Sequence, residues 1–138
     1  MTGELKLVPQ VGGDQWSEID AAVAEFSKEQ HWPDDLDFTV RLILEELVLN
    51  AVSYGAEDHS TEVRLQLTSD DSEVRIVLSD NGMPFNPLVE SPAPDLDASV
   101  EERKVGGLGV HFVQSISDSA TYEWVEGHNQ MTVVKLRG

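Results

Sequence analysis

The chain has 138 residues, of which 40% are hydrophobic and 25% charged, and it contains no cysteine. This size predicts one domain, residues 1–138, and the composition excludes disulfides, thiolate metal sites and cysteine nucleophiles. The 26 acidic and 9 basic residues give a formal net charge of -17, which repels nucleic acid and anionic lipid. We therefore expect no binding to nucleic acid or membranes, and the acidic surface is either simply solvated or docks a basic protein partner. No signal-peptide core and no apolar run of the ~20 residues that cross a bilayer is found, so a cytoplasmic protein is expected.

The hydrophobic pattern predicts elements in the order strand, helix, helix, strand, strand, helix, strand, strand. Their approximate ranges are 5–9, 14–31, 34–55, 63–67, 74–78, 108–116, 120–125 and 131–136. We expect His31-Trp32-Pro33 to end the first helix and Asp34 or Asp35 to cap the second. Hairpin turns are expected at residues 69–72 and at Gly127-His128-Asn129.

This order of elements is typical of a two-layer α/β sandwich, in which helices cover one face of a mixed, mainly antiparallel sheet. The connection formed by residues 83–105 is too long for an ordinary loop and holds four of the six prolines. Connections of this length are usually functional, so we interpret residues 83–105 as a lid.

The second helix carries Glu46 and Asn50 on one face, one turn apart and among apolar neighbours. Arg41 and Glu45 have the same spacing and are expected to pair on the exposed face. Taken alone, Glu46 and Asn50 are explained as surface polar residues of an amphipathic helix. The functional alternative makes Asn50 an oxygen ligand for Mg²⁺ and Glu46 a base for a hydroxyl or water that attacks a phosphate.

A second candidate segment, Asp80-Asn81-Gly82, follows the strand at residues 74–78. A carboxylate fixed at a strand end can accept a hydrogen bond from the exocyclic amine of adenine, and Gly82 lets the chain turn close to the flat base. The alternative is a plain turn that ends the strand, because Asp, Asn and Gly are common turn residues.

A third segment is the glycine cluster Gly106-Gly107-Leu108-Gly109, which opens onto the next predicted helix. Backbone amides at a helix N-terminus form a ready phosphate site. Arg103 and Lys104 stand just before the cluster, and one of them can neutralise a γ-phosphate or both can belong to a solvated charge cluster. The spacing fits neither a Walker loop nor a Rossmann fingerprint.

Together the three segments resemble the GHKL superfamily of ATPases and kinases, which share the Bergerat ATP-binding fold. Within it they are most similar to the small serine kinases that act as bacterial anti-sigma factors. The matching motifs are Glu46-x-x-x-Asn50-Ala51 for the N box, Asp80-Asn81-Gly82-Met83-Pro84-Phe85 for the first glycine box and Gly106-Gly107-Leu108-Gly109 for the second. The resemblance covers about residues 4–136.

The resemblance implies that ATP and Mg²⁺ bind here, with Asn50 on Mg²⁺, Glu46 as catalytic base and Asp80 on the adenine. Gly82 then belongs to the turn beneath the base. The nucleotide's phosphate end is assigned to Lys104, Gly106, Gly107, Leu108 and Gly109, with Arg103 competing for the role of Lys104. Tyr54 departs from the family, because many relatives have histidine at that place.

The activity implied by the resemblance is that of an ATP-dependent serine/threonine protein kinase that works as an anti-sigma-type partner-switching regulator. Such a kinase phosphorylates a serine of a STAS-domain antagonist and is then free to hold another client, often a sigma factor. The alternative is an ATP-binding adaptor that controls protein binding without phosphotransfer. The presence of Glu46 favours the enzyme, although Glu46 can instead orient a Mg²⁺-bound water. Candidate partner residues are Asp14, Glu18 and Asp20. Relatives of this kind are commonly dimers, while the sequence itself leaves the oligomeric state open.

Overall fold

A computed structural model describes residues 2–8, 15–50, 62–81 and 113–137 of the chain. The elements are β1 (Gly3–Leu7), α1 (Gln15–Glu29), α2 (Asp34–Asn50), β2 (Val63–Ser69), β3 (Glu73–Asp80), β4 (Ser119–Val125) and β5 (His128–Leu136). Residues 113–116 are also helical and belong to the helix predicted at 108–116. The other residues predicted for that helix, 108–112, and the predicted lid at residues 83–105 lie outside the described residues.

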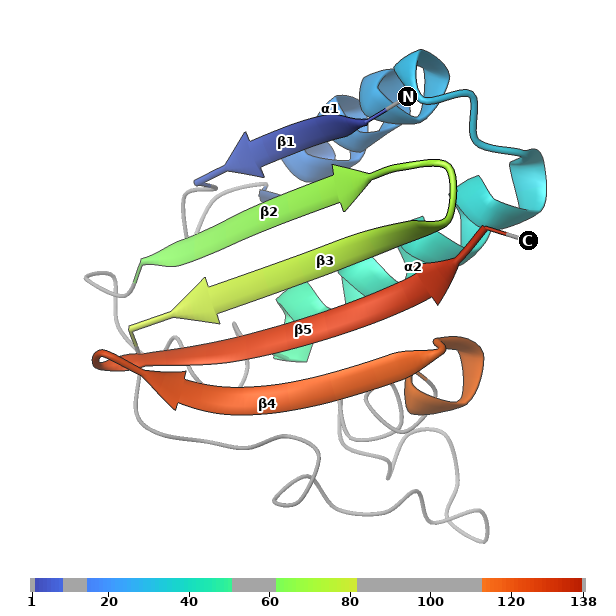
Figure 1. Ribbon diagram of the computed structural model, residues 1–138. Helices are drawn as coiled ribbons and strands as arrows, with labels where there is room; N and C mark the ends of the chain where they lie inside the picture. The colour runs from blue at the N-terminus through green and yellow to red at the C-terminus, as the bar shows by residue number, and fades with distance from the viewer. Residues whose placement is uncertain (1, 9–14, 51–61, 82–112, 138) are drawn as a thin grey trace, which may run out of the picture.

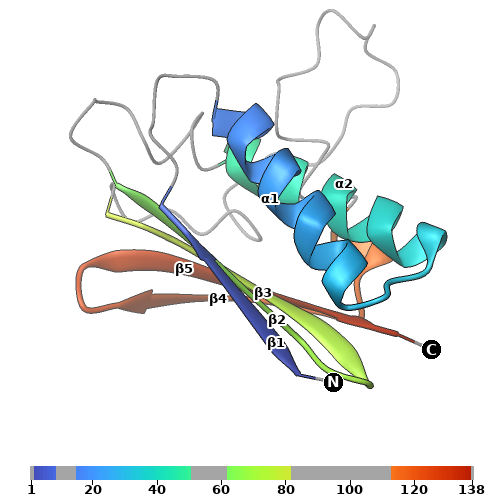
Figure 2. The ribbon, with the colours of Figure 1, turned by 90° about the horizontal axis from the view of Figure 1, so that it is seen from above.

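The five strands form one sheet in the order β1-β2-β3-β5-β4, and each neighbouring pair is antiparallel. Both long helices lie on the same face of this sheet and run in opposite directions (Figures 1 and 2). The predicted two-layer α/β sandwich with a mainly antiparallel sheet is therefore confirmed. Within the described strands no parallel pair occurs.

The core lies between the sheet and the two helices. Strand residues of one parity are buried, as shown by Leu65, Leu67 and Ile76, while residues of the other parity face away from the helices. From the helices, α1 contributes Ile19 and Val23 at 0% exposure, and α2 contributes a longer apolar stripe. The alternation determines which strand side chains lie on the face that the helices cover. A site at the end of the sandwich would use side chains of that face.

α1 ends in a hydrogen-bonded Schellman motif, at the position that the sequence indicated. His31 adopts a φ of 56°, its N–H donates to Lys28 O at 3.3 Å, and the N–H of Trp32 donates to Ser27 O at 3.1 Å. The Trp32 ring then packs edge-on against Phe26, with centroids 5.6 Å apart, and its Nε1 donates to the buried Ser69 Oγ at 3.0 Å. Trp32 therefore ties the helix end to the sheet.

The C-terminal end of the described chain closes the same corner of the molecule. The Arg137 guanidinium donates to Asp70 O at 2.9 Å in the β2–β3 turn. It also donates to Gln30 O at 3.2 Å and to His31 O at 3.3 Å after α1. One side chain thus satisfies carbonyls from a helix end and a hairpin turn.

The expected pair of Arg41 with Glu45 is wrong. The Arg41 guanidinium instead contacts Asp37 Oδ1 at 3.1 Å, one turn earlier in α2, and Asp20 Oδ1 at 3.1 Å in α1. A guanidinium can bind two carboxylates at once, and the second one links the two helices. Asp20, a candidate partner residue, is therefore half-buried in a helix–helix contact, whereas Glu18 is exposed.

The two hairpins differ in how well the sequence predicted them. The β2–β3 turn is as expected, because Asp70 Oδ1 accepts from the N–H groups of Ser72 at 2.7 Å and Glu73 at 2.9 Å. These bonds hold the pKa of the Asp70 carboxyl below its usual range. The turn predicted at Gly127-His128-Asn129 is wrong: Glu126 and Gly127, with φ of 49° and 82°, form it, and β5 already begins at His128.

Candidate functional site

Asp80, the predicted adenine contact, is the last residue of β3 and is only 5% exposed. It has the same strand parity as Ile76 and Leu78, so its side chain lies on the face that the helices cover. A carboxylate at such a place needs hydrogen-bond donors, because burial without them is costly. One donor is Asn129 Nδ2, at 3.0 Å from Asp80 Oδ1.

Asn129 is the site residue that sequence reasoning missed. It lies directly opposite Asp80 in the β3–β5 register and is 5% exposed. Its Oδ1 accepts from the hydroxyl of Tyr122, on β4, at 2.5 Å. The signal in the sequence that could have identified Asn129 is the Glu126-Gly127 pair. If these two residues form the turn, Asn129 lies within the following strand, on the same face as Met131.

Asn81, the middle residue of the first glycine-box motif, fixes the end of the β2–β3 ladder. Its side-chain Oδ1 accepts from Glu62 N at 2.7 Å, and its own N–H donates to Glu62 O at 3.3 Å. These two bonds hold the backbone just after Asp80 against β2. The strand end that carries the buried carboxylate is therefore held from both sides, by Glu62 on β2's side and by Asn129 on β5's side.

Glu46, the predicted base, is half-buried near the end of α2, next to the fully buried Leu47. Burial, and secondarily the charge of Glu45, raises the pKa of the Glu46 carboxyl above its ordinary value of 4.5. A raised pKa makes the ionised carboxylate a better proton acceptor. The environment of Glu46 is therefore suited to proton transfer, whereas Glu45 is exposed.

The structure brings the two predicted halves of the site to the same end of the sandwich. The C-terminal end of α2, which contains Glu46 and ends at Asn50, points toward the end of the sheet at which β3 terminates (Figures 1 and 2). Only the backbone of Asn50 is described. The other predicted residues lie outside the described part of the chain: Gly82, Arg103, Lys104, Gly106, Gly107, Leu108 and Gly109, together with Tyr54 and Asp14.

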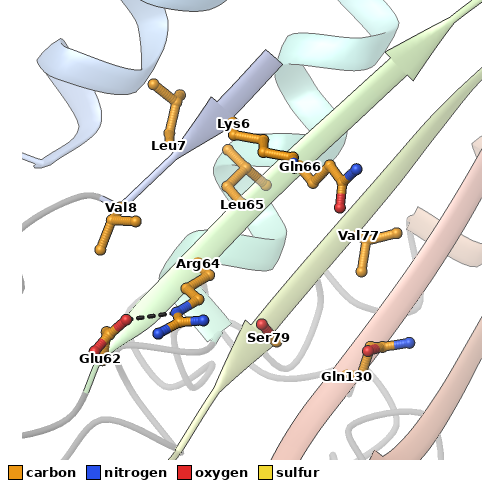
Figure 3. Close-up of a pocket in the computed structure, with 10 residues that line it drawn as sticks. All are labelled: Lys6, Leu7, Val8, Glu62, Arg64, Leu65, Gln66, Val77, Ser79 and Gln130. Atoms are coloured by element: carbon orange, nitrogen blue, oxygen red, sulfur yellow. Dashed lines mark hydrogen bonds and ion pairs between the residues drawn. The ribbon is translucent and has the colours of Figure 1, made fainter. Parts of the chain in front are cut away.

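A hollow of about 420 Å³ lies elsewhere, on the sheet face that the helices leave uncovered (Figure 3). Its polar lining includes Lys6, Gln66 and Gln130, together with the ion pair of Arg64 with Glu62. Asp80 and Glu46 do not line it, so it is separate from the candidate site. Among the described residues no group of three or more histidine, aspartate or glutamate side chains is placed to hold a metal ion.

The two-layer α/β fold is consistent with the family that the sequence matches. The chain matches the histidine kinase-like ATPase domain family over residues 13–137 and belongs to that family. Membership of this family implies ATP binding, and it confirms the predicted resemblance to the GHKL superfamily. None of the described helices has the length and apolar character needed to cross a membrane.

One characterised relative is serine/threonine-protein kinase BtrW of Bordetella bronchiseptica. The two sequences are 27% identical over 103 residues, which are 74% of this chain and 72% of BtrW. The similarity therefore extends over most of both proteins.

Proposed function

We propose that this protein is an ATP-dependent serine/threonine kinase that acts as an anti-sigma-type partner switch and phosphorylates a serine of a STAS-domain antagonist. The half-buried Glu46 carries the proposal, because burial raises the pKa of its carboxyl and it lies in the last turns of α2, whose C-terminal end points toward the end of β3. The relative named as a serine/threonine-protein kinase supports the reaction class. The STAS substrate rests on the resemblance of the three motifs to anti-sigma factor kinases.

In the proposed reaction the serine hydroxyl oxygen of the antagonist forms a bond to the γ-phosphorus of ATP. The bond from that phosphorus to the β–γ bridging oxygen breaks, ADP leaves, and the hydroxyl proton passes to the Glu46 carboxylate. Asp80 holds the adenine through its exocyclic amine. In this proposal α2 supplies the residue that accepts the proton, and β3 supplies the residue that binds the base.

Mg²⁺ is part of the proposal, since phosphoryl transfer needs the charge of the phosphates to be neutralised. Asn50, one turn after Glu46, is the proposed protein ligand, because its side-chain oxygen is a hard, neutral donor. The described acidic residues form no cluster that would hold the ion without the nucleotide. We expect Mg²⁺ to enter with the phosphates of ATP, because Mg²⁺ usually keeps several waters and substrate phosphates among its ligands.

The test is phosphate transfer from radiolabelled ATP to the cognate STAS-domain protein, with Glu46→Gln and Glu45→Gln compared. Both variants remove one carboxylate from adjacent positions of α2, but only Glu46 is half-buried. Glu46→Gln should keep ADP binding and lose about 100-fold or more in transfer rate, as expected for a general base, and Glu45→Gln should stay near the wild-type rate.

Two outcomes contradict separate parts of the proposal. Normal transfer by Glu46→Gln removes Glu46 from the role of base. Nucleotide binding by the wild type without any transfer to its true partner supports the alternative, an adaptor that uses ATP to control protein binding.

A further inference from the structure

A line of three polar side chains crosses the sheet at the strand end where the adenine contact is proposed. Tyr122 on edge strand β4 donates its hydroxyl to Asn129 Oδ1 at 2.5 Å, and Asn129 Nδ2 donates to Asp80 Oδ1 at 3.0 Å. The three residues come from neighbouring strands in the order β4, β5 and β3. Asn129 stands directly across from Asp80 in the register, and Tyr122 is the diagonal neighbour of Asn129.

Hydrogen-bond chemistry fixes the direction of this line. A carboxylate can only accept, so Asn129 must turn its NH₂ group toward Asp80. Its carbonyl oxygen then faces Tyr122, whose hydroxyl must donate. With both ends of the carboxamide engaged, Asn129 cannot rotate without losing one buried and one partly buried hydrogen bond. The bond from Asn129 Nδ2 to Oδ1 in turn restricts the rotation of the Asp80 carboxylate.

We propose that Asn129, held by Tyr122, is the positioning residue for Asp80 and makes the site select 6-amino over 6-oxo purine nucleotides. The inference rests on the proposed contact of Asp80 with the base. A 6-amino group donates to the fixed carboxylate, whereas a 6-oxo group places a second acceptor against it. An Asn129 free to rotate would let Asp80 turn away and would offer its own NH₂ to the 6-oxo group, so the preference depends on Tyr122.

The experiment measures the dissociation constants of ADP and of inosine diphosphate, which carries a 6-oxo group, by calorimetry on the full chain. The ratio of the two constants is the readout. The wild type should prefer ADP by about tenfold or more, the value of one hydrogen bond to a charged group. Tyr122→Phe, which removes one oxygen, should lower this ratio by about threefold to tenfold. Asn129→Leu should bring the ratio close to one.

The matched control is Thr121→Val, which removes a hydroxyl from the residue before Tyr122. Thr121 is exposed and stands opposite Thr132 on the other face of the β4–β5 hairpin. It should leave the ratio at the wild-type value. If Asn129→Leu fails to fold in a thermal melt, Tyr122→Phe alone decides.

The outcomes separate this inference from the proposed function. If Tyr122 has a purely structural role, Tyr122→Phe weakens the binding of ADP and of inosine diphosphate equally. The ratio of the two dissociation constants is then unchanged, and this result overturns the inference. A wild type that binds both nucleotides equally also overturns it while leaving nucleotide binding intact. A wild type that binds neither nucleotide refutes the proposed function itself.

Discussion

Replacing Asp80 by asparagine tests the assignment of the adenine contact most directly. The substitution keeps the shape of the side chain and an oxygen that can still accept from Asn129 Nδ2, now 3.0 Å from Asp80 Oδ1. What it removes is the negative charge at a position that is 5% exposed. A hydrogen bond to a charged group contributes about 1.5–3 kcal/mol, so Asp80→Asn should weaken ADP binding by about 10- to 150-fold.

Stability separates this effect from unfolding. Because the bond to Asn129 can be kept, the unfolding free energy of Asp80→Asn should stay within about 1 kcal/mol of the wild type. Asp80→Ala, in contrast, removes the buried hydrogen bond between Asp80 and Asn129 and should lower the unfolding free energy by about 1–3 kcal/mol. Urea denaturation measures both values.

The assay is isothermal titration of ADP with Mg²⁺, with Asp34→Asn as the control. Asp34 is an exposed carboxylate in the first turn of α2, at the opposite end of that helix from Glu46. Its loss of charge should leave the dissociation constant unchanged. A folded Asp80→Asn variant that binds ADP within about twofold of the wild type would contradict the assignment. A twofold change in the dissociation constant is smaller than the loss of one hydrogen bond to a charged group would cause, so Asp80 would not be the contact for the base.

Further predictions concern Glu46 and the end of α1. Since burial raises the pKa of the Glu46 carboxyl, its contribution to stability is present below pH 4.5 and lost as the pH rises through the raised pKa. Glu46→Gln should therefore raise the unfolding free energy at pH 7 but not below pH 4.5, and a urea series that shows equal gains at both would contradict this. His31→Gly should raise the melting temperature, because glycine relieves about 1 kcal/mol of left-handed strain at φ 56°, and a lower melting temperature would mean that the entropy of the unfolded chain dominates. Trp32→Phe should cost about 1–3 kcal/mol, since it leaves the hydroxyl of Ser69 unpaired at 1% exposure, and adding Ser69→Ala should recover part of that loss in a double-mutant cycle.

The sequence predicted the fold well where the pattern depends on the local chain alone. The strict alternation of apolar and polar residues predicted β2 and β3, because a strand with one buried face has an apolar side chain at every second position. The end of α1 could be placed because proline at position 33 cannot continue a helix. These features need no knowledge of distant residues.

The errors occur where a distant residue decides between local alternatives. Arg41 has an acid four residues away on either side, and Asp20 of the neighbouring helix favours the one at Asp37. Asn129 comes two residues after Gly127 and has the residue type of a turn, but the partner that holds it, Asp80, lies 49 positions away in the chain. Glu46 and Asp80 could be named from their motifs, and only the pairing of strands revealed what holds Asp80.

The position of β5 in the sheet has a consequence for how the chain folds. β5 is the last of the described strands in sequence, yet it lies between β3 and β4 and contributes Met131 and Val133 to the core. The sheet can therefore be completed only once β5 has been synthesised, and contacts of such long sequence separation slow folding. Until then β3 presents an open edge beside Asp80, so a truncation before β5 would divide the sheet rather than shorten it.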